Sequence, residues 1–178
     1  MSAQTLIPAV PLQYMAIGFS HDQEMGNDTV LECVISTDEY VEPEAFASFN
    51  NRHSNDRVYL PEEIRKNYLS NVTGGIVDGR LFCQFSVQII PQIRLSNGEI
   101  PKLWSLNKEY YIIAATGSAQ PDELNPHDTS PDSYFYPIVS TESSNPSETV
   151  STASSATAQL LCKNIIYPIL LFLSLHFN

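Results

Sequence analysis

The chain has 178 residues, of which 43% are hydrophobic and 10% aromatic, enough for one folded domain with its own core. Nine Lys and Arg against 20 Asp and Glu give a net charge of −11, so the surface repels polyanions and nucleic acid is not an expected partner. Seven Gly and 12 Pro exclude a collagen-like or wholly low-complexity chain.

Composition divides the chain into four parts. Residues 1–11 are uncharged and contain prolines, which predicts an irregular N-terminal segment that leads into the domain. Residues 12–139 alternate apolar runs with polar loops and form the expected domain. Residues 140–164 are rich in Ser and Thr, with too little apolar area to offset the entropy of ordering, so we expect a flexible stalk. Residues 165–178 form an almost purely apolar tail.

The predicted elements of the domain are mostly strands. Apolar or aromatic runs at 12–19, 30–35 and 110–115 are typical of strands, and 61–68 shows one or two turns of helical pattern. Residues 80–90 alternate with a period of two and predict a half-buried strand. One face of that strand carries Leu81, Cys83, Phe85, Val87 and Ile89. The pattern predicts an all-β fold, an antiparallel β-sandwich with an immunoglobulin-like two-sheet architecture.

Three glycines between these elements favour turns. Gly74, Gly75 and Gly79 are predicted to be turn glycines, because the Lys-Ser/Thr pair of a phosphate-binding loop does not follow them.

The sequence of the C-terminal tail indicates a membrane-anchoring segment. Its apolar run is shorter than the roughly 20 residues of a spanning helix. Small residues from Ser154 onward, then a spacer, then the tail, have the layout of a glycolipid (GPI) anchor signal, with Ser154 as the attachment residue. A tail-anchored or spanning segment and a buried strand are the alternatives.

The N-terminus does not have the layout of a signal peptide. We expect that the chain begins inside a longer protein at the cell surface or outside the cell. The alternative is a cytosolic chain in which the tail is not an anchor signal.

The cysteines and sequons fit an extracellular protein. Cys162 lies in the segment that anchor transfer would remove, leaving Cys33 and Cys83 as an even pair. A bridge between them would close a loop of about 50 residues, worth roughly 4 kcal/mol in the chain-entropy model. The alternative is that both are small buried apolar residues. Asn27 and Asn71 begin glycosylation sequons.

The unusual segment is residues 14–33, YMAIGFSHDQEMGNDTVLEC, where a strand leads into a polar loop. Met25 is a large apolar side chain among polar neighbours, so it either packs over an edge or binds something soft. In the same segment His21, Asp22 and Asp28 are candidate ligands for a divalent cation, although acidic loops are usually only solvated.

This segment, followed by GGIVDGRLFCQF, LNKEYYIIAATGSA and NPHDTSPDSYFYPIV, resembles the DOMON domain of the animal ferric-chelate reductase group. The resemblance covers about residues 12–142. In that family the domain is a β-sandwich related to the cytochrome domain of cellobiose dehydrogenase, in which one Met and one His hold a b-type haem. The resemblance implies Met25 and His127 as the ligands of the haem iron. It also implies that the chain is truncated at its start and lacks the family's membrane cytochrome.

The implied function is electron transfer. Thioether and imidazole together suit one-electron chemistry, so the resemblance implies a membrane-anchored module that takes electrons from a membrane cytochrome or small reductant and passes them to ferric iron. It would be a component of a reductase system, and no catalytic residues are assigned. The alternative is a cofactor-free DOMON module that binds protein or sugar. Candidate walls of a haem site are Met15, Ile17, Phe19, Ile113 and Phe135.

Overall fold

The computed structural model describes residues 1–133 and 135–148. The predicted apolar tail and Ser154 lie outside these residues. In the described part, nine strands form two antiparallel sheets, one of six strands in the order β5-β4-β3-β2-β8-β9 and one of three in the order β1-β7-β6. The strands are β1 (Ser2–Gln4), β2 (Leu12–Ser20), β3 (Asp28–Ser36), β4 (Glu44–Asn51), β5 (Ser54–Arg57), β6 (Leu69–Val77), β7 (Arg80–Val87), β8 (Tyr111–Ser118) and β9 (Ile138–Val139).

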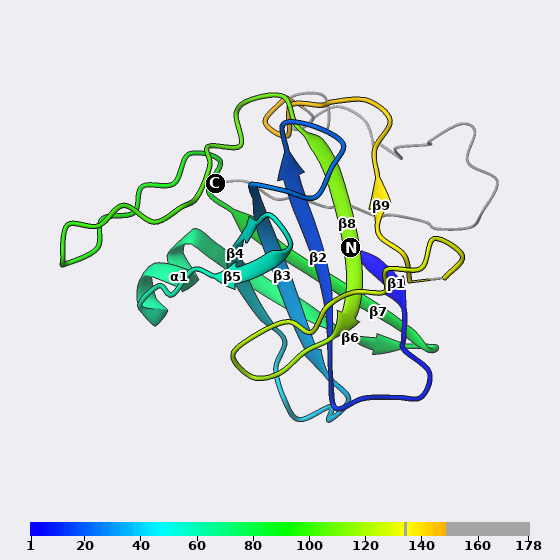
Figure 1. The fold of residues 1–178 in the computed structure, drawn as a ribbon. Coiled ribbons are helices and arrows are strands. Elements are labelled where there is room, and N and C mark those ends of the chain that lie inside the picture. The colour runs from blue at the N-terminus through cyan, green and yellow to red at the C-terminus, as the bar shows by residue number, and fades with distance from the viewer. Residues whose placement is uncertain (134, 149–178) are drawn as a thin grey trace, which may run out of the picture.

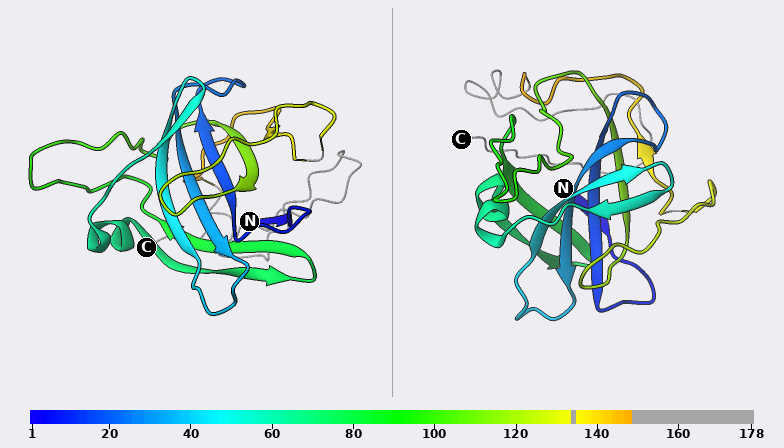
Figure 2. Two further views of the ribbon diagram at one scale, coloured as in Figure 1. Left: turned by 60° about the horizontal axis from the view of Figure 1, so that its bottom comes forward. Right: turned by 60° about the vertical axis from the view of Figure 1, so that its left-hand side comes forward.

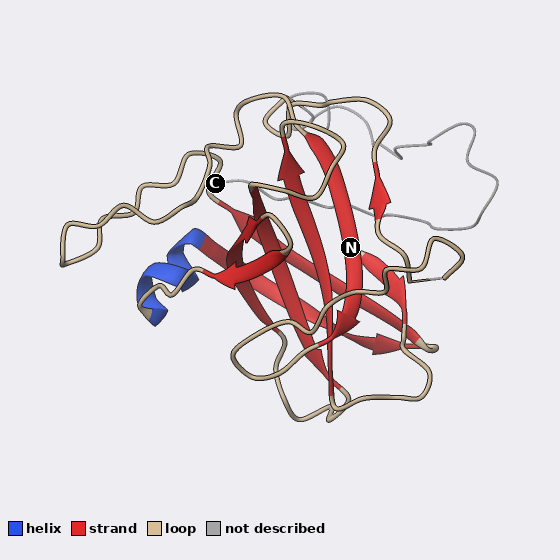
Figure 3. Ribbon diagram, in the orientation of Figure 1, coloured by secondary structure: helices blue, strands red, loops and turns tan. Residues whose placement is uncertain are grey.

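The two sheets pack face to face. In Figure 1 the strands β6 and β7 cross behind β2 and β3, and Figure 3 shows that strands dominate the molecule. One helix, α1 (Glu62–Tyr68), leads directly into β6 and lies on the opposite side of the molecule from β8 and β9, as both views of Figure 2 confirm. The prediction of an all-β, two-sheet sandwich is therefore confirmed.

Strand β2 is the central element of the larger sheet and is buried on both faces. Residues 13–20 are all buried. Met15, Ile17 and Phe19 point into the core between the sheets, whereas Tyr14 and Ala16 pack on the other face, against Val30 and Ala119. The nearly continuous apolar sequence of β2 follows from this double burial, and its two polar residues, Gln13 and Ser20, are themselves buried.

The predicted strands at 12–19, 30–35, 80–90 and 110–115 correspond to β2, β3, β7 and β8. Strands β4, β5 and β6 carry no such signal. The buried positions of β4 include Ala45, Ala47 and Asn50, β5 is entirely polar (SNDR), and β6 contains a bulge and two glycines. Small and polar residues fit these strands because backbone pairing with neighbouring strands requires no apolar alternation, and in β5 the Arg57 side chain adds an ion pair with Glu32 of β3.

Both ends of the predicted domain differ from the expectation. Ser2–Gln4 form a strand in the segment expected to be irregular, because backbone pairing with the edge of β7 requires no apolar alternation. At the other end, residues 140–148 of the expected stalk contact β8. Tyr110 and Ser144 exchange two backbone hydrogen bonds, and the Ser140 hydroxyl accepts a bond from the Ile112 amide.

Two of the three predicted turn glycines are strand residues. Gly74 and Gly75 belong to β6, and a Cβ at Gly74 would lie 2.7 Å from the carbonyl oxygen of Phe82 on β7. Glycine is therefore required there for close strand contact rather than for a turn. Gly79 does lie in the turn between β6 and β7, with a φ of 71° that favours glycine.

A disulfide bridge joins Cys33 of β3 to Cys83 of β7 and so links the two sheets. Both residues are almost fully buried, with exposed fractions of 0% and 2%. The predicted pairing is confirmed, and the bridge closes a loop of 50 residues across the core.

Removing this bridge should lower stability substantially. Because the bridge restricts the unfolded chain, Cys33→Ala/Cys83→Ala should lose about 4 kcal/mol of unfolding free energy, measured by urea denaturation. Reducing the wild-type protein with dithiothreitol should produce a comparable loss, and the double variant should then be insensitive to the reductant. Equal stability of the variant and the oxidised wild type would contradict this expectation.

Candidate functional site

Met25 lies in the loop from β2 to β3, at the top of Figure 1, where several hydrogen bonds fix the backbone on both sides of it. The amide of Glu24 donates to Asp22 Oδ1 over 2.9 Å. The amide of Gly26 donates to Asp28 Oδ2 over 2.8 Å. The Asp28 carboxylate is 1% exposed and also accepts a bond from Asn50 Nδ2. The Met25 side chain is consequently held half-buried in a defined loop.

His127 lies in the segment that follows β8 and folds back over the sheet. The amide of Asn125 donates to the Ser118 carbonyl, and its side-chain amide donates to the Ser118 hydroxyl. Ala119 also donates to the Leu12 carbonyl and pairs with Leu124. This short turn is anchored to the end of β8 and leads the chain to a half-buried His127.

The structure brings the two predicted ligands together. Met25 Sδ and His127 Nε2 lie 3.5 Å apart, although 102 residues separate them in sequence. His127 Nδ1 lies 2.9 Å from the carbonyl oxygen of Asp128. In the tautomer with its proton on Nδ1, His127 donates to this carbonyl, and Nε2 then presents a lone pair to the Met25 sulfur.

A cavity of about 260 Å³ adjoins His127 beside β8, and Met25 is not among the residues that line it. It is lined by Leu6, Thr116, Gly117, Ser118, Pro126, His127, Asp128 and Phe135. Of the predicted haem walls, Phe135 lines this cavity, whereas Met15, Ile17 and Phe19 pack between the sheets. These three residues face the opposite side of β2 from the segment that carries His127 and do not line this cavity.

A model of the DOMON domain matches residues 6–117, more than half of the chain. The chain belongs to the DOMON family. The match is to the domain as such and distinguishes no subgroup within the family. Met25 lies inside the matched residues, and His127 lies beyond their end. No curated protein and no solved structure matches the chain.

In this DOMON domain, the buried Tyr14 packs on Gly117, one of the residues that line the smaller cavity. Its ring lies over Gly117, where an added Cβ would be 2.7 Å from Tyr14 Cε1 and 2.9 Å from the phenolic oxygen. Tyr14 is 3% exposed. Burial, followed by the negative charge of Glu32, raises the pKa of its phenol well above the ordinary value, so Tyr14 is neutral at physiological pH.

A buried ion pair holds the segment before His127. Glu32 is fully buried on β3, and its Oε2 accepts bonds from Arg57 Nε at 3.2 Å and Nη2 at 2.9 Å. Arg57 Nη1 donates to the Pro121 carbonyl over 2.9 Å, and the guanidinium lies 3.9 Å from the ring centroid of Phe46. Arg57 thus joins strand β5 to the segment that covers the sheet, an arrangement with no sequence signal.

The Asp128 side chain adds a negative charge next to His127. Hydrogen bonds from the Ser133 side chain first, and then from the Ser130 amide at 3.0 Å, hold the pKa of this carboxyl below its usual range. Asp128 is therefore ionised at neutral pH.

The structure does not bring the candidate divalent-cation ligands together. His21 stacks on Trp104 with ring centroids 4.5 Å apart, Asp22 accepts a bond from the Glu24 amide within its own loop, and Asp28 bonds to Gly26 and Asn50. Among residues 1–133 and 135–148, no group of three His, Cys, Asp or Glu side chains is close enough to hold a metal.

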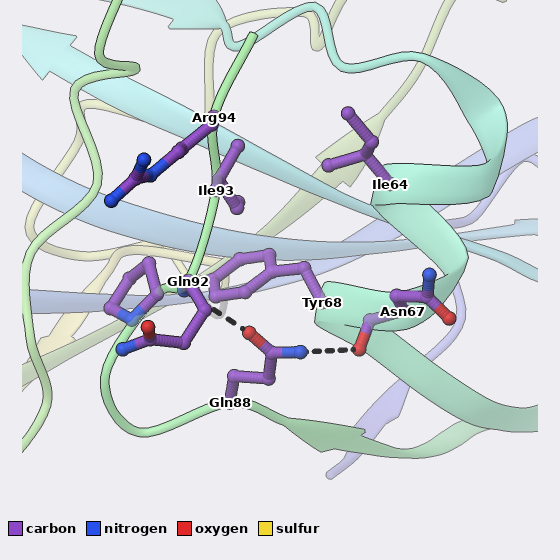
Figure 4. A pocket seen from close by; sticks show the side chains of 8 residues that line it. Ile64, Asn67, Tyr68, Gln88, Gln92, Ile93 and Arg94 are labelled. Carbon is purple, nitrogen blue, oxygen red and sulfur yellow. Dashed lines mark hydrogen bonds between the residues drawn. The ribbon is translucent and has the colours of Figure 1, made fainter.

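A larger cavity of about 560 Å³ lies beside α1, shown in Figure 4. It is lined by Ile64, Asn67, Tyr68, Gln88, Pro91, Gln92, Ile93 and Arg94. Gln88 bridges its two sides, because its Nε2 donates to the Asn67 carbonyl while its Oε1 accepts from the Gln92 amide. No predicted ligand lines this cavity, so the functional proposal concerns the smaller one.

Both predicted glycosylation residues, Asn27 and Asn71, are exposed. Asn27 precedes β3 in the loop that carries Met25, and Asn71 lies at the bulge of β6. None of the described helices is long and apolar enough to cross a membrane.

Gly117→Ala should destabilise the domain by about 1–3 kcal/mol, because the new methyl group would overlap the Tyr14 ring. Gly26→Ala is the matched control, since a Cβ there meets nothing within 4 Å. Urea unfolding measures both. Adding Tyr14→Leu to Gly117→Ala should recover part of the loss, and equal stability of the two alanine variants would refute the clash.

Arg57→Ala should cost about 3–5 kcal/mol of unfolding free energy, because it leaves the Glu32 carboxylate buried and unpaired. The exposed pair between Lys66 and Glu62 provides the comparison, and Lys66→Ala should cost less than about 1 kcal/mol. Combining Arg57→Met with Glu32→Leu should restore much of the stability. A loss no larger than that of Lys66→Ala would show that the pair contributes little.

Proposed function

We propose that this DOMON domain is an extracellular b-type haem module that relays single electrons, with Met25 and His127 as the two protein ligands. The observation that carries the proposal is the 3.5 Å approach of Met25 Sδ to His127 Nε2 from two separate loops. A haem iron held by these donors supplies one-electron chemistry, and a thioether ligand favours its reduced state.

The donor set fits the group. Thioether sulfur and imidazole nitrogen are established axial ligands of haem, and the hydrogen bond from His127 Nδ1 to the Asp128 carbonyl leaves Nε2 available. A carbonyl partner of this kind is the usual means by which a protein orients a ligating histidine. Met25 Sδ and His127 Nε2 would hold the iron from two separate loops.

The residues around the pair have distinct tasks. Asp28 and Asp22 fix the loop backbone beside Met25 through the amides of Gly26 and Glu24. Gln23 ties the same loop to the segment after β9, because its Nε2 donates to the Ser140 carbonyl at 3.2 Å. Leu6, Pro126 and Phe135 give the adjoining cavity apolar surface that would exclude water.

The domain would act at the outer cell surface. The buried disulfide supports an oxidising compartment, domains of this family are typically extracellular or cell-surface modules, and the exposed Asn27 and Asn71 would carry glycans. Attachment through Ser154 and the apolar tail belongs to the same proposal. As in the resemblance to the ferric-chelate reductase group, the electron donor would be a membrane cytochrome or small reductant, and the acceptor ferric iron.

Haemin reconstitution of the full chain tests the function. All proteins carry Cys162→Ser, because a free thiol could itself ligate iron. The reconstituted protein should show a sharp Soret band that shifts on dithionite reduction. Met25→Leu and His127→Ala should each weaken haem binding at least tenfold and remove the low-spin spectrum, because each removes one axial donor.

The controls are His53→Ala, an exposed histidine, and Met15→Leu, a volume-conserving change in the core. Both should bind haem like the parent protein. A folded sample without a Soret band would defeat the haem proposal and leave the cofactor-free module for protein or sugar. Spectra that are unchanged in Met25→Leu and His127→Ala would place any bound haem elsewhere.

A further inference from the structure

The geometry points to a second ligand for the same two side chains. We propose that, when no haem is bound, Met25 and His127 form a binding site for a soft monovalent metal ion, Cu(I). The inference goes beyond the proposed function and does not require it, although the two ligands would exclude each other because they share both donors.

The separation of the donors carries this inference. With bonds of roughly 2.0 Å to nitrogen and 2.3 Å to sulfur, the observed distance of 3.5 Å between Met25 Sδ and His127 Nε2 corresponds to an angle of about 109° at the ion. This is the angle of a tetrahedral ion, so a small ion fits the loops as they lie.

The chemistry of the two donors selects the ion. A thioether sulfur is soft and favours Cu(I), and imidazole nitrogen suits copper as well. Hard cations such as Mg²⁺ or Ca²⁺ prefer oxygen ligands. In the tautomer that donates from Nδ1 to the Asp128 carbonyl, Nε2 and the sulfur present lone pairs to each other at 3.5 Å, whereas in the other tautomer Nε2 donates to the sulfur.

The charge around the site favours a cation. Asp128 follows His127 directly, and the residues that line the adjoining cavity include no Lys or Arg. The chain as a whole carries a net charge of −11, which raises the local concentration of cations at its surface. Two donors leave further coordination positions for a small exogenous ligand.

The test uses the haem-free full chain with Cys162→Ser, because a thiolate would bind soft metals itself. Ag(I) serves as a redox-inert probe in calorimetric titration, and Cu(I) is measured under ascorbate by competition with bicinchoninate. We expect one saturable site, with a shift of the Met25 ε-methyl NMR resonance and none for Met15. Met25→Leu and His127→Ala should each weaken binding at least tenfold.

Met15→Leu and His53→Ala are the matched controls and should bind Ag(I) like the parent, while circular dichroism confirms that every variant is folded. Absence of saturable binding, or equal binding in Met25→Leu and His127→Ala, would overturn the inference. Haem binding is measured on the same preparations. Protein that binds haem through both residues but no Ag(I) overturns this inference alone, and protein that binds Ag(I) but no haem supports it while the proposed function fails.

Discussion

The double burial of β2 is the constraint on which the rest of the structure depends. Its inner face packs against the smaller sheet through Met15, Ile17 and Phe19, so that sheet must lie beneath it. Its outer face carries Tyr14 and Ala16, which would be exposed if nothing covered the larger sheet. Burying apolar surface of this kind contributes roughly 25 cal/mol per Å², and the chain obtains it by folding the segment after β8 back over the sheet.

That covering segment is also the segment that carries a candidate ligand. Ala119 and Leu124 pack on the outer face of the sheet, and His127 follows within a few residues. The loop with Met25 continues directly from the far end of β2. Both ligand-bearing segments are thus positioned by the same strand, and the packing that stabilises the fold also brings sulfur and imidazole together.

The segment that covers the larger sheet contacts a buried ion pair, Glu32 and Arg57, whose burial carries a desolvation cost. A carboxylate that is fully buried in the outer layer is expensive to desolvate, and its second oxygen, Oε1, has no hydrogen-bond partner. A domain in which apolar residues of similar volume replaced this ion pair would often be no less stable. Because Arg57 also donates to the Pro121 carbonyl, the pair fixes one position of the covering segment, which apolar packing alone does not do.

The sequence predicted the parts of this arrangement that depend on side-chain pattern. Strands β2, β3, β7 and β8 alternate or are continuously apolar, and Cys33 and Cys83 both lie in them. Strand β5 was missed because its stabilising contact is a charge pair with Glu32, a residue distant in sequence. The sequence singled out Met25 as a large apolar side chain in a polar loop, but its pairing with His127 was identified only through a resemblance, since a lone His next to a proline carries no signal. The carbonyl that orients His127 belongs to backbone, which no side-chain pattern reveals.

The distance between the two donors decides which ligand the loops favour. At 3.5 Å the two donors have the separation expected on one tetrahedral ion. The hydrogen bonds of Asp28 and Asp22 hold one donor, and the turn anchored on Ser118 holds the other. Two of these three bonds end on strand residues, Asp28 of β3 and Ser118 of β8, so the larger sheet itself positions both donor-bearing segments.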